Sequence, residues 1–554
     1  MKAFKIAAAA VLCGVLFFTG CFAGNGGTGD EEEPNADPIV CNVFSVSYEE
    51  VNVETDMAKF LSENKTDGKR TYGFVESVWH RLKVNGAETA VYSARCGQNV
   101  HSFAWVDVQT NAQDGALGLD VRLDLLTKDK SEATVLPEKN NVSATYDDGA
   151  VSAVLNGYGS HTFVFDKSPD KALTLYVAPY SESTLPVGWS ERKIQAGEYT
   201  REQTNFTESN TLYRFESGVY DLNAISLPSN SILYFERGAY VRVHEEFEGD
   251  YYAALASSRT ENVTVCGRAV FDFSDCTGGD NKTKGVYSFD EVKNLSVEGL
   301  ISVNSNGWTM CASACENAWI SRCMFFGYRT FSDGIMLSDC MDSGARDNFV
   351  RTGDDAIEVK SFSGNADPNV YTRNVLFENN CVWTDKGIAY GCIYESRKMI
   401  DGVYFRNNSV GFAQAAWSDH LGCAVMQMGS QKGTVWQNVY FEKMEVYSAS
   451  CALVSIFNRA VNEEEGGVIK NVFCKDLVLK YAAETQRPVS ALSVVIRLGE
   501  GVSGSNCKIN NIRLDNVMFA GTALTALNLA DYASFSIAEG ATFSKSTIKI
   551  NEGV

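Results

Sequence analysis

The chain has 554 residues, of which 45% are hydrophobic. This is enough apolar side chain for a large core and more residues than one domain usually holds, so we expect a folded protein of two domains and exclude a disordered chain. The net charge of −21 argues against nucleic acid as a partner and, less strongly, against polyanionic substrates, because long-range repulsion slows their approach.

Residues 1–21 have the pattern of a bacterial lipoprotein signal. Two lysines precede a short apolar run, and the run ends in Thr19-Gly20-Cys21. The run is too short for a comfortable transmembrane span, and no second apolar run approaches membrane length. We therefore expect a lipid on Cys21 as the only link to a membrane, with residues 22–39 as a flexible acidic tether. The protein would then lie at the bacterial cell envelope, anchored to the outer membrane or cell surface, or be secreted.

The sixteen cysteines do not predict a metal site. In an exported protein disulfides are an option. However, many of these cysteines, such as Cys323, Cys392 and Cys474, fall within apolar strand-like runs, where a buried thiol is the simpler interpretation. Cys311 and Cys315 have the spacing of a metal-binding pair, but no second Cys or His pair follows them at a matching distance. We expect no metal and no cofactor.

Residues 40–205 are predicted to form a β-sandwich. Stretches such as 81–84, 102–108 and 162–165 alternate between apolar and polar residues and are separated by Gly, Asn and Asp. Short strands at this spacing are typical of two packed sheets. No group in this domain looks catalytic, and the sequence does not separate a packing role from a carbohydrate-binding role.

Residues 206–554 are predicted to form a right-handed parallel β-helix, which makes the whole chain all-β. Asn recurs directly before an alternating strand, at intervals of about one coil. Such coils bury their apolar residues on one another, and stacked Asn side chains satisfy backbone groups that no ladder reaches. Amphipathic helical periods are almost absent between the strands, which excludes an α/β fold. The recurring residues are Asn262, Asn294, Asn317, Asn374, Asn438, Asn471 and Asn511.

Three carboxylates lie about one coil apart in this helix. Asp333 stands in Phe331-Ser-Asp-Gly-Ile335, and Asp354 and Asp355 follow Gly353. Successive coils stack at about 4.8 Å, so residues 21 apart in sequence can become neighbours in space. The sequence therefore predicts that the three acids gather on one face of the helix.

Strand alternation after Gly353 predicts which side chains face outward. It places Ile357 and Val359 in the core, and it places Asp354, Ala356, Glu358 and Lys360 on the outer face. Asp355 breaks this alternation and would point inward, where an unpartnered carboxylate costs several kcal/mol. Either the turn swings Asp355 outward or this residue has a function.

These motifs resemble those of the β-helical glycosidases. Ser332-Asp-Gly334 and Gly353-Asp-Asp355 are similar to the Asn-Thr-Asp and Gly-Asp-Asp motifs of the family 28 polygalacturonases and the family 49 dextranases and isopullulanases. The polygalacturonase pattern continues with Gly-His-Gly and Arg-Ile-Lys motifs on the next two coils, and the chain departs from both. The matching stretches are 386–391 and 424–428. The preceding β-sandwich, the acidic charge and the missing basic pair make the chain more similar to family 49.

The resemblance implies an inverting endo-glycosidase that acts, as a monomer, on a neutral α-linked polysaccharide such as a dextran-like glucan. Met426 and Met428 stand where a galacturonate carboxylate would need Arg and Lys. The resemblance further implies Asp354 as the general acid, with Asp333 and Asp355 as the residues that hold the attacking water. Crowded carboxyl groups raise the pKa of one of them and keep it protonated.

Two expectations about distance and substrate contacts follow. Stacked neighbours lie about 4.8 Å apart, closer than the roughly 6.5–9.5 Å between the carboxyls of inverting enzymes, so the side chains must diverge. Glu358 and Lys360 are candidate substrate contacts, with a surface ion pair as the alternative. His420 is a weaker candidate, and aromatic rings near the acids, each with a core role as its alternative, offer faces for sugar rings. The rings are those of Trp308, Tyr328, Trp383, Tyr390, Tyr394 and Trp417.

Other functions remain open at this point. One is a polygalacturonase-like pectin hydrolase. Another is a β-helical polysaccharide lyase, in which the acids bind calcium and Arg329, Arg351 or Lys360 acts as the base. A third is a surface β-helix that binds glycans without cleaving them.

Overall fold

The computed structural model describes residues 40–48, 74–96, 99–111, 117–127, 129–244, 253–276, 286–393, 396–414, 424–431, 434–459, 467–482, 494–500, 507–537, 541, 543 and 548–551. The predicted signal and tether, residues 1–39, lie outside these ranges. In the described part of the chain, no helix has the length and apolar character needed to cross a membrane.

Two sheets form the N-terminal β-sandwich. All their strand pairs are antiparallel except β6 with β12. The seven-stranded sheet contains β1 (Cys41–Ser45), β2 (Phe74–Glu76), β5 (Tyr92–Cys96), β6 (Asn99–Thr110), β8 (Ala133–Leu136), β11 (Gly159–Phe165) and β12 (Ser168–Pro179). The five-stranded sheet contains β3 (His80–Val84), β4 (Ala87–Thr89), β7 (Leu119–Leu125), β9 (Ala144–Asp147) and β10 (Ala150–Leu155). A short 3-10 helix, η1 (Glu138–Asn140), follows β8.

Apolar side chains from both sheets meet between them. Leu82, Leu123 and Val151 of one sheet share a buried cluster with Val106 and Leu175 of the other. Along β7 and β10, buried apolar residues alternate with more exposed ones, which is the pattern expected of strands in two packed sheets. The predicted β-sandwich is confirmed.

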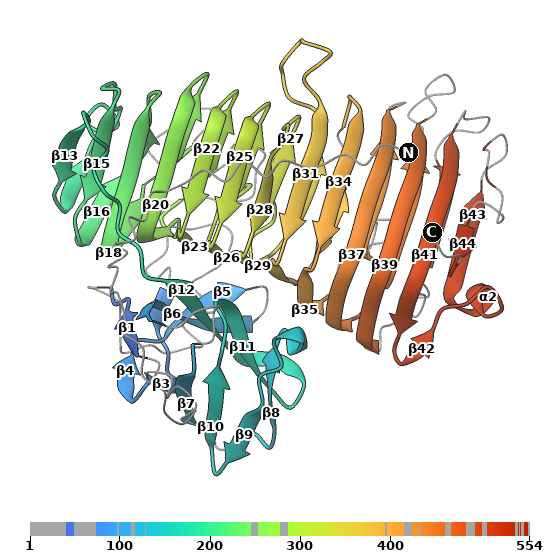
Figure 1. Ribbon diagram of the computed structural model, residues 1–554, viewed down its shortest axis with the longest axis horizontal. Helices are drawn as coiled ribbons and strands as arrows, with labels where there is room; N and C mark the ends of the chain where they lie inside the picture. Colours follow the sequence, from blue (N-terminus) through green and yellow to red (C-terminus); the bar gives the residue numbers. More distant parts are fainter. Residues whose placement is uncertain are drawn as a thin grey trace, which may run out of the picture. The chain divides into compact units, whose positions relative to one another are not determined.

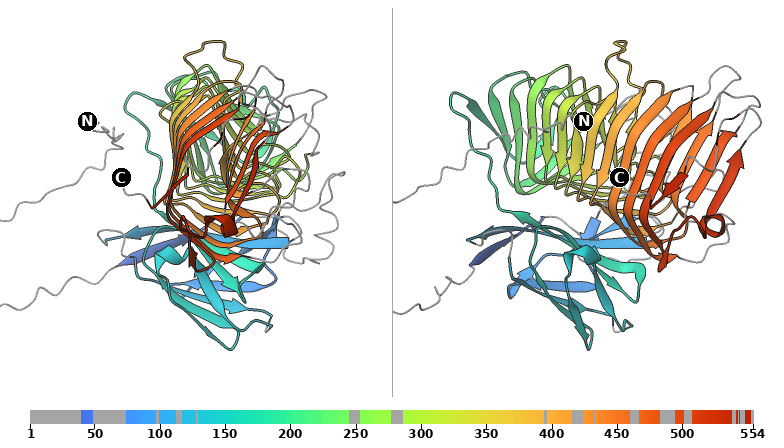
Figure 2. Two further views of the ribbon diagram at one scale, coloured as in Figure 1. Left: turned by 90° about the vertical axis from the view of Figure 1, so that its right-hand side faces the viewer. Right: turned by 45° about the vertical axis from the view of Figure 1, so that its right-hand side comes forward.

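The rest of the chain winds into a right-handed parallel β-helix (Figures 1 and 2). One sheet has the strands β13 (Ser190–Ile194), β14 (Gly197–Tyr199), β15 (Thr211–Phe215), β16 (Gly218–Leu222), β18 (Ser231–Val243), β20 (Glu261–Asp272), β22 (Lys293–Glu298), β23 (Ile301–Val303), β25 (Glu316–Ser321), β26 (Met324–Phe326), β28 (Gly344–Arg346), β29 (Phe349–Thr352), β31 (Thr372–Glu378), β32 (Cys381–Thr384), β34 (Ile400–Arg406), β35 (Ser409–Ala413), β37 (Val435–Ala449), β39 (Val468–Ala482), β41 (Lys508–Phe519), β42 (Thr522–Ala523) and β44 (Ile548–Ile550).

The second sheet of the helix carries one strand per coil. Its strands are β17 (Ile225–Ser226), β19 (Leu255–Ser258), β21 (Tyr287–Asp290), β24 (Met310–Ser313), β27 (Ile335–Ser338), β30 (Ile357–Lys360), β33 (Tyr390–Cys392), β36 (Ala424–Gln431), β38 (Ala452–Arg459), β40 (Val494–Glu500) and β43 (Ala533–Ile537). A short helix, α2 (Leu529–Tyr532), precedes β43. The predicted all-β fold with a C-terminal β-helix is confirmed, although the parallel strands begin at β13, before the expected boundary between residues 205 and 206.

Like residues stack on like residues along the inside of the helix. Phe377, Phe405 and Phe441 are fully buried and lie in register on β31, β34 and β37. Their ring centroids are 5.0 Å and 4.9 Å apart, with planes tilted by 11° and 6°. Buried thiols, among them Cys381, Cys392 and Cys474, fill strand positions as the apolar runs predicted, and Cys323 is buried directly before β26.

The recurring Asn residues mark a left-handed backbone turn. Asn262, Asn294 and Asn317 have φ of 56°, 56° and 54°. Each donates a side-chain hydrogen bond to the residue one coil before it, over 2.8 Å from Asn262 to Asn230, 2.9 Å from Asn294 to Asn262 and 2.9 Å from Asn317 to Asn294. The Asn side chains therefore bond to one another, and the conformation that Asn tolerates well explains why Asn recurs.

The sandwich and the helix belong to one unit, Val40–Val554, and share buried contacts. Asp107 of β6 is fully buried and accepts hydrogen bonds from Arg237 (2.7 Å) and Arg268 (2.9 Å) of the helix. Phe103 of the sandwich stacks on Phe326 of β26, with ring centroids 4.8 Å apart. The β-sandwich thus packs on the β-helix through buried side chains.

Substitution of Asn294 tests the turn. We expect Asn294→Ala to lower the free energy of unfolding by about 1 kcal/mol more than Asn294→Gly, because only Ala has a Cβ that opposes the left-handed conformation. Both variants lose the same hydrogen bonds. Calorimetric midpoints for the two proteins measure the difference, and a Gly variant less stable than the Ala variant would contradict the role of the turn.

Candidate active site

Asp333 and Asp355 occupy equivalent positions in successive coils. Each lies in the turn that enters the second sheet, Asp333 before β27 and Asp355 before β30. The Gly334 N–H donates to the Asp355 carbonyl over 2.8 Å, and Ile335 pairs with Ile357. The coil here is 22 residues long, so the stacked partner of Asp333 is Asp355. Asp354, 21 residues further on, is a neighbour as expected, since its charge acts on Asp333.

Ser332 ties the two turns together. Its buried hydroxyl donates to the Arg329 carbonyl over 2.7 Å and accepts from the Gly353 N–H over 3.1 Å. Gly353 has no room for a side chain, since a Cβ would lie 2.6 Å from the Tyr328 carbonyl carbon. The residues that flank the acids therefore fix the spacing between one coil and the next.

Asp354 is half-buried and is held by backbone groups of both turns. Its carboxylate accepts hydrogen bonds from the N–H groups of Phe331 (3.1 Å) and Asp355 (3.0 Å). Asp355 in turn accepts the Ile388 N–H from the following coil over 2.9 Å. Both carboxylates are thus oriented by backbone donors rather than by flexible side chains.

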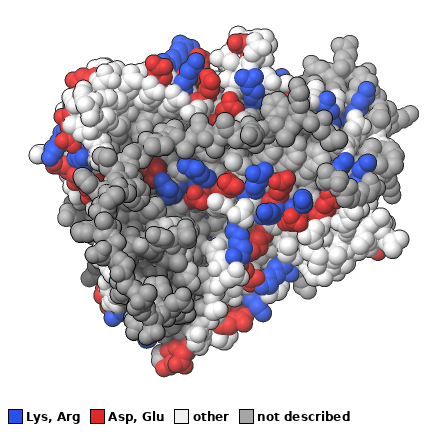
Figure 3. Space-filling view, in the orientation of Figure 1, with Lys and Arg blue, Asp and Glu red and all other residues white. Residues whose placement is uncertain are grey.

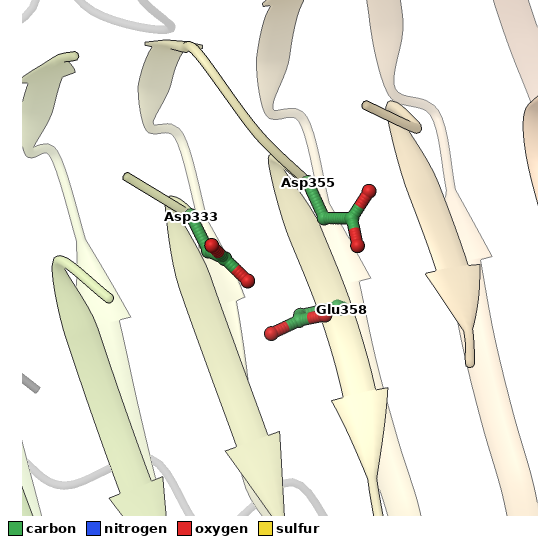
Figure 4. Close-up of side chains that lie close together, drawn as sticks. All are labelled: Asp333, Asp355 and Glu358. Carbon is green, nitrogen blue, oxygen red and sulfur yellow. The ribbon is translucent and has the colours of Figure 1, made fainter. Parts of the chain in front are cut away.

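Glu358 joins Asp333 and Asp355 to form a group of three carboxylates (Figure 4). One oxygen from each lies within 4.8 Å of one oxygen from each of the others. Asp333 is 4% exposed and Glu358 is fully buried. Lys360 Nζ lies 3.2 Å from Glu358 Oε2, which makes the predicted pair a buried one instead of a surface one.

Strand alternation held for most of β30. Ile357 and Val359 lie in the core, and Glu358 and Lys360 lie on the other face. The expectation for Ala356 is wrong, because this residue is in the core as well. The turn residue before the strand does not follow the two-residue period, and this same turn swings Asp355 out of the core to the side of Glu358 (Figure 4).

Burial and crowding raise the pKa values of the stacked pair, Asp333 and Asp355. Burial raises the pKa of Asp333 well above its ordinary value, and the charges of Asp354, Glu358 and Asp355 add to this, against an opposing effect of Lys360. The pKa of Asp355 is raised by burial, Asp354 and Glu358, against the Ile388 N–H and Lys360. The crowding expected from the sequence therefore falls on Asp333 and Asp355, and it favours proton retention by this pair.

The three carboxylates also have the geometry of a metal site. Carboxylate oxygens are the ligands that calcium and magnesium prefer. However, the Lys360 ammonium, 3.2 Å from Glu358, already supplies a positive charge, and a bound cation would have to overcome its repulsion. Among the described residues the arrangement favours proton chemistry over metal binding.

Of the aromatic residues predicted to contact a sugar, Trp308 lies near the acids, whereas Tyr390 lies in the core. Trp308 is half-buried and near the acids, with Lys360 Nζ 4.5 Å from its ring centroid and the Phe362 ring 5.9 Å away. Tyr390 is a core residue whose hydroxyl donates to the carbonyls of Asn380 and Ser409, so its predicted substrate role is wrong.

Trp383 is likewise buried, between the sandwich and the helix. Its ring centroid lies 5.0 Å from that of His101 and 4.9 Å from that of Phe412. No sugar can reach it, and its predicted role is wrong. Tyr328 is also buried, 4.2 Å from the Arg95 guanidinium carbon. Tyr394, Trp417 and His420 lie outside the described residues.

The argument for a neutral substrate loses its basis. Met426 and Met428 are fully buried core residues of β36, so they do not stand where a substrate carboxylate would bind. The residue of β36 on the side of the acids is Gln427, which is in register with Gly391, itself in register with Glu358. A strand register shifted by one residue exchanges the two faces, which moves the methionines from the outer face to the core.

The arginines proposed as lyase bases are buried and bind other groups of the protein. Arg329 is buried and donates to the carbonyls of Cys276 and Phe273. Arg351 is buried and paired with Asp385, with guanidinium nitrogens 3.0 Å and 3.2 Å from its carboxylate oxygens. Neither arginine is placed to abstract a proton from a substrate.

Gly387 is a site residue that sequence reasoning missed. A Cβ at this position would lie 2.6 Å from Asp355 Oδ1 and 2.6 Å from the Asp354 carbonyl carbon. The turn of the following coil therefore packs directly on the acids. The only available signal was the Gly itself, in the stretch aligned with the Gly-His-Gly motif.

The fold and the row of acids define a β-helical carbohydrate-active protein. The model of the family "Glycosyl hydrolases family 28" matches residues 238–529, more than half of the 554. The chain belongs to this family. The closer similarity to family 49 that the sequence suggested is not supported, and no curated protein matches the chain.

Solved structures with the same architecture are distant in sequence. The exopolygalacturonase of Thermotoga maritima is 18% identical, with a TM-score of 0.41, over 62% of this chain and 85% of that one. The polygalacturonase of Erwinia carotovora ssp. carotovora is 15% identical, with a TM-score of 0.41, over 67% and 98%. The family 28 exopolygalacturonase of Yersinia enterocolitica is 11% identical, with a TM-score of 0.47, over 84% and 94%.

Gly387→Ala tests the packing of the turn on the acids. The added methyl group must displace Asp355, and a shift of this kind costs about ten- to a hundredfold in the rate of glycosidic cleavage. Gly364→Ala is the matched control, because nothing lies within 4 Å of a Cβ there. Initial rates of reducing-end release, with circular dichroism as a check of folding, measure the effect. Equal rates in the two variants would show that the turn does not position the acids.

Proposed function

We propose that the protein is a secreted or surface-anchored glycoside hydrolase that cleaves an α-linked uronic acid polysaccharide of the pectic type. Membership of family 28 supports the reaction class. The observation that carries the proposal is the set of three aspartates, Asp333, Asp354 and Asp355, in the turns of two adjacent coils, with the carboxylates of Asp354 and Asp355 oriented by backbone N–H groups. Solved family 28 members with the same fold are polygalacturonases by name.

Charge does not oppose an acidic substrate. On the described part of the face in Figure 3, basic and acidic side chains are interspersed. They form ion pairs such as Lys293–Glu316 and Arg322–Glu298. The net charge of −21 therefore does not act as one field there, and salt screens it beyond about 8–10 Å.

Two residues beside the acids are suited to bind a uronate sugar. Lys386 is half-buried in the turn whose Gly387 packs on Asp354 and Asp355, and we assign it to the substrate carboxylate. Trp308, with its ring near Lys360, offers a face for the sugar ring. In this scheme the missing Arg-Lys pair is replaced by a lysine from the neighbouring turn.

The distances also support an assignment of the chemical roles. Oxygens of Asp333 and Asp355 lie within 4.8 Å of each other, less than the roughly 6.5–9.5 Å between the acid and base of inverting enzymes. These two carboxyls therefore act on the same side of the sugar and hold the attacking water. We assign the proton for the departing oxygen to Asp354, which is not in the group of Asp333, Asp355 and Glu358 and is oriented by the Phe331 N–H.

Product analysis tests the reaction and the substrate together. We expect polygalacturonate to yield new reducing ends without ultraviolet-absorbing unsaturated ends, and we expect dextran to remain intact. Chelation of divalent cations should leave the rate unchanged, because Lys360 neutralises part of the acidic group. Unsaturated ends would identify a lyase, cleavage of dextran would restore a neutral substrate, and no product from a broad panel of glycans would favour a binding protein.

Asp354→Asn tests the proton donor. We expect turnover to fall by about two to four powers of ten with little change in stability, because only bond cleavage needs this proton. On a substrate with a good leaving group, activity should fall less in Asp354→Asn than in Asp333→Asn or Asp355→Asn. Asp367→Asn, in an exposed loop, is the control. If the good leaving group instead rescues Asp333→Asn or Asp355→Asn, the donor belongs to the buried pair.

A further inference from the structure

Glu358 is a fourth carboxyl group that the proposed reaction does not use. It is fully buried, so it cannot contact a sugar directly. Its oxygens are nevertheless within 4.8 Å of oxygens of Asp333 and Asp355 (Figure 4). A buried charge is costly unless it is paired, and this cost requires an explanation.

The strands beside Glu358 offer it no charged partner. In register with it are Met336 on β27 and Gly391 on β33. Its described ion-pair partner is Lys360, two residues further along the same strand and on the same face, with Nζ 3.2 Å from Oε2. Lys360 is 3% exposed. Together the two residues place one negative and one positive charge directly beside the aspartates.

We propose that Glu358 is a positioning residue which, balanced by Lys360, determines how protons are distributed between Asp333 and Asp355. The inference rests on the proposed function, in which this aspartate pair holds the attacking water. Glu358 acts through the aspartates and does not touch the substrate. The reaction needs the pair to be ionised when water loses its proton, so the pair's neighbours determine the pH range of activity.

Several charged side chains among the described residues act on the pair. Asp354, Glu358 and Lys360 act on both aspartates, and Asp333 is also affected by Asp355. The Cys311 thiol on β24 lies next to this group, and burial with the charges of Asp333 and Glu358 raises its pKa well above its ordinary value, so it carries no charge. Glu358 raises the pKa of each aspartate and Lys360 lowers it. Removal of the Glu358 charge should therefore lower the pKa values of the two aspartates, and removal of the Lys360 charge should raise them.

The test is the pH profile of kcat/KM for Glu358→Gln and Lys360→Met. Loss of the Glu358 charge lowers the pKa of the aspartates, so ionisation occurs at lower pH and the acid limb should move down by about one pH unit. Loss of the Lys360 charge should move the acid limb up. The double variant should return towards the parent profile. Glu316→Gln, in an ion pair 3.7 Å long on the exposed face of β25, should leave the profile in place.

A second measurement needs no activity. An aspartate whose pKa is raised on folding stabilises the protein below its ordinary pKa of about 3.9, and this stabilisation is lost as the pH rises towards the folded value. As the aspartates lose their protons above a pH of about 4, the thermal midpoint of the parent protein should therefore fall. This fall should be less steep in Glu358→Gln than in Glu316→Gln.

The pH profiles and the thermal slopes together distinguish a failure of the role of Glu358 from a failure of the proposed function. Unchanged acid limbs and unchanged thermal slopes in both variants, in a protein that cleaves polygalacturonate, would overturn the role of Glu358 and leave the proposed function standing. Altered thermal slopes in a protein that cleaves no glycan would support the proton distribution and overturn the proposed function. If Glu358→Gln does not fold, an unmoved limb in Lys360→Met overturns the inference.

Discussion

The parallel register between coils is the constraint on which the rest of this molecule depends. Because each strand lies on its equivalent one coil earlier, every residue is stacked on the residue that occupies the same position there. Inside the helix this rule produces stacked phenylalanines such as Phe405 on Phe441, and at one edge it produces the Asn row. At the entry to the second sheet the same rule places Asp333 against Asp355. Stacking is favourable for rings and amides, whereas for carboxylates it is unfavourable, and the crowded charges add to burial in raising the pKa values of the two acids.

The acids tolerate this cost because their surroundings are rigid. Backbone N–H groups of Phe331 and Ile388 orient two of the carboxylates, and Ser332 connects the turns that carry them. A flexible site would relieve the repulsion by moving the side chains apart. Here the relief is limited to protonation and to the nearby Lys360 ammonium, and both responses depend on pH.

The sequence predicted the repeated features of the fold and failed at the features that occur once. Asn262 and its successors revealed the coils because the pattern is repeated. Ala356 was misplaced because a turn interrupts the two-residue period and no repeat corrects it. The same turn swings Asp355 outward, which was one of the two outcomes left open for it. Met426 and Tyr390 were assigned to the wrong face for the same reason, since an error of one residue exchanges core and surface. Trp383 is buried by the sandwich, a contact between distant segments that no local pattern encodes.

The contact between His101 and Arg351 bears on how this architecture arose. Burial and the neighbouring guanidinium lower the pKa of His101 well below its ordinary value, so the ring is neutral, and its Nδ1 accepts a hydrogen bond from Arg351 over 2.8 Å. Arg351 is on β29, the strand that leads into the turn of Asp354 and Asp355. Without the sandwich, this arginine and the rings around it would face water immediately beneath the catalytic turn. Exchange of the N-terminal domain for an unrelated one would therefore leave these buried groups of the helix without their packing partners.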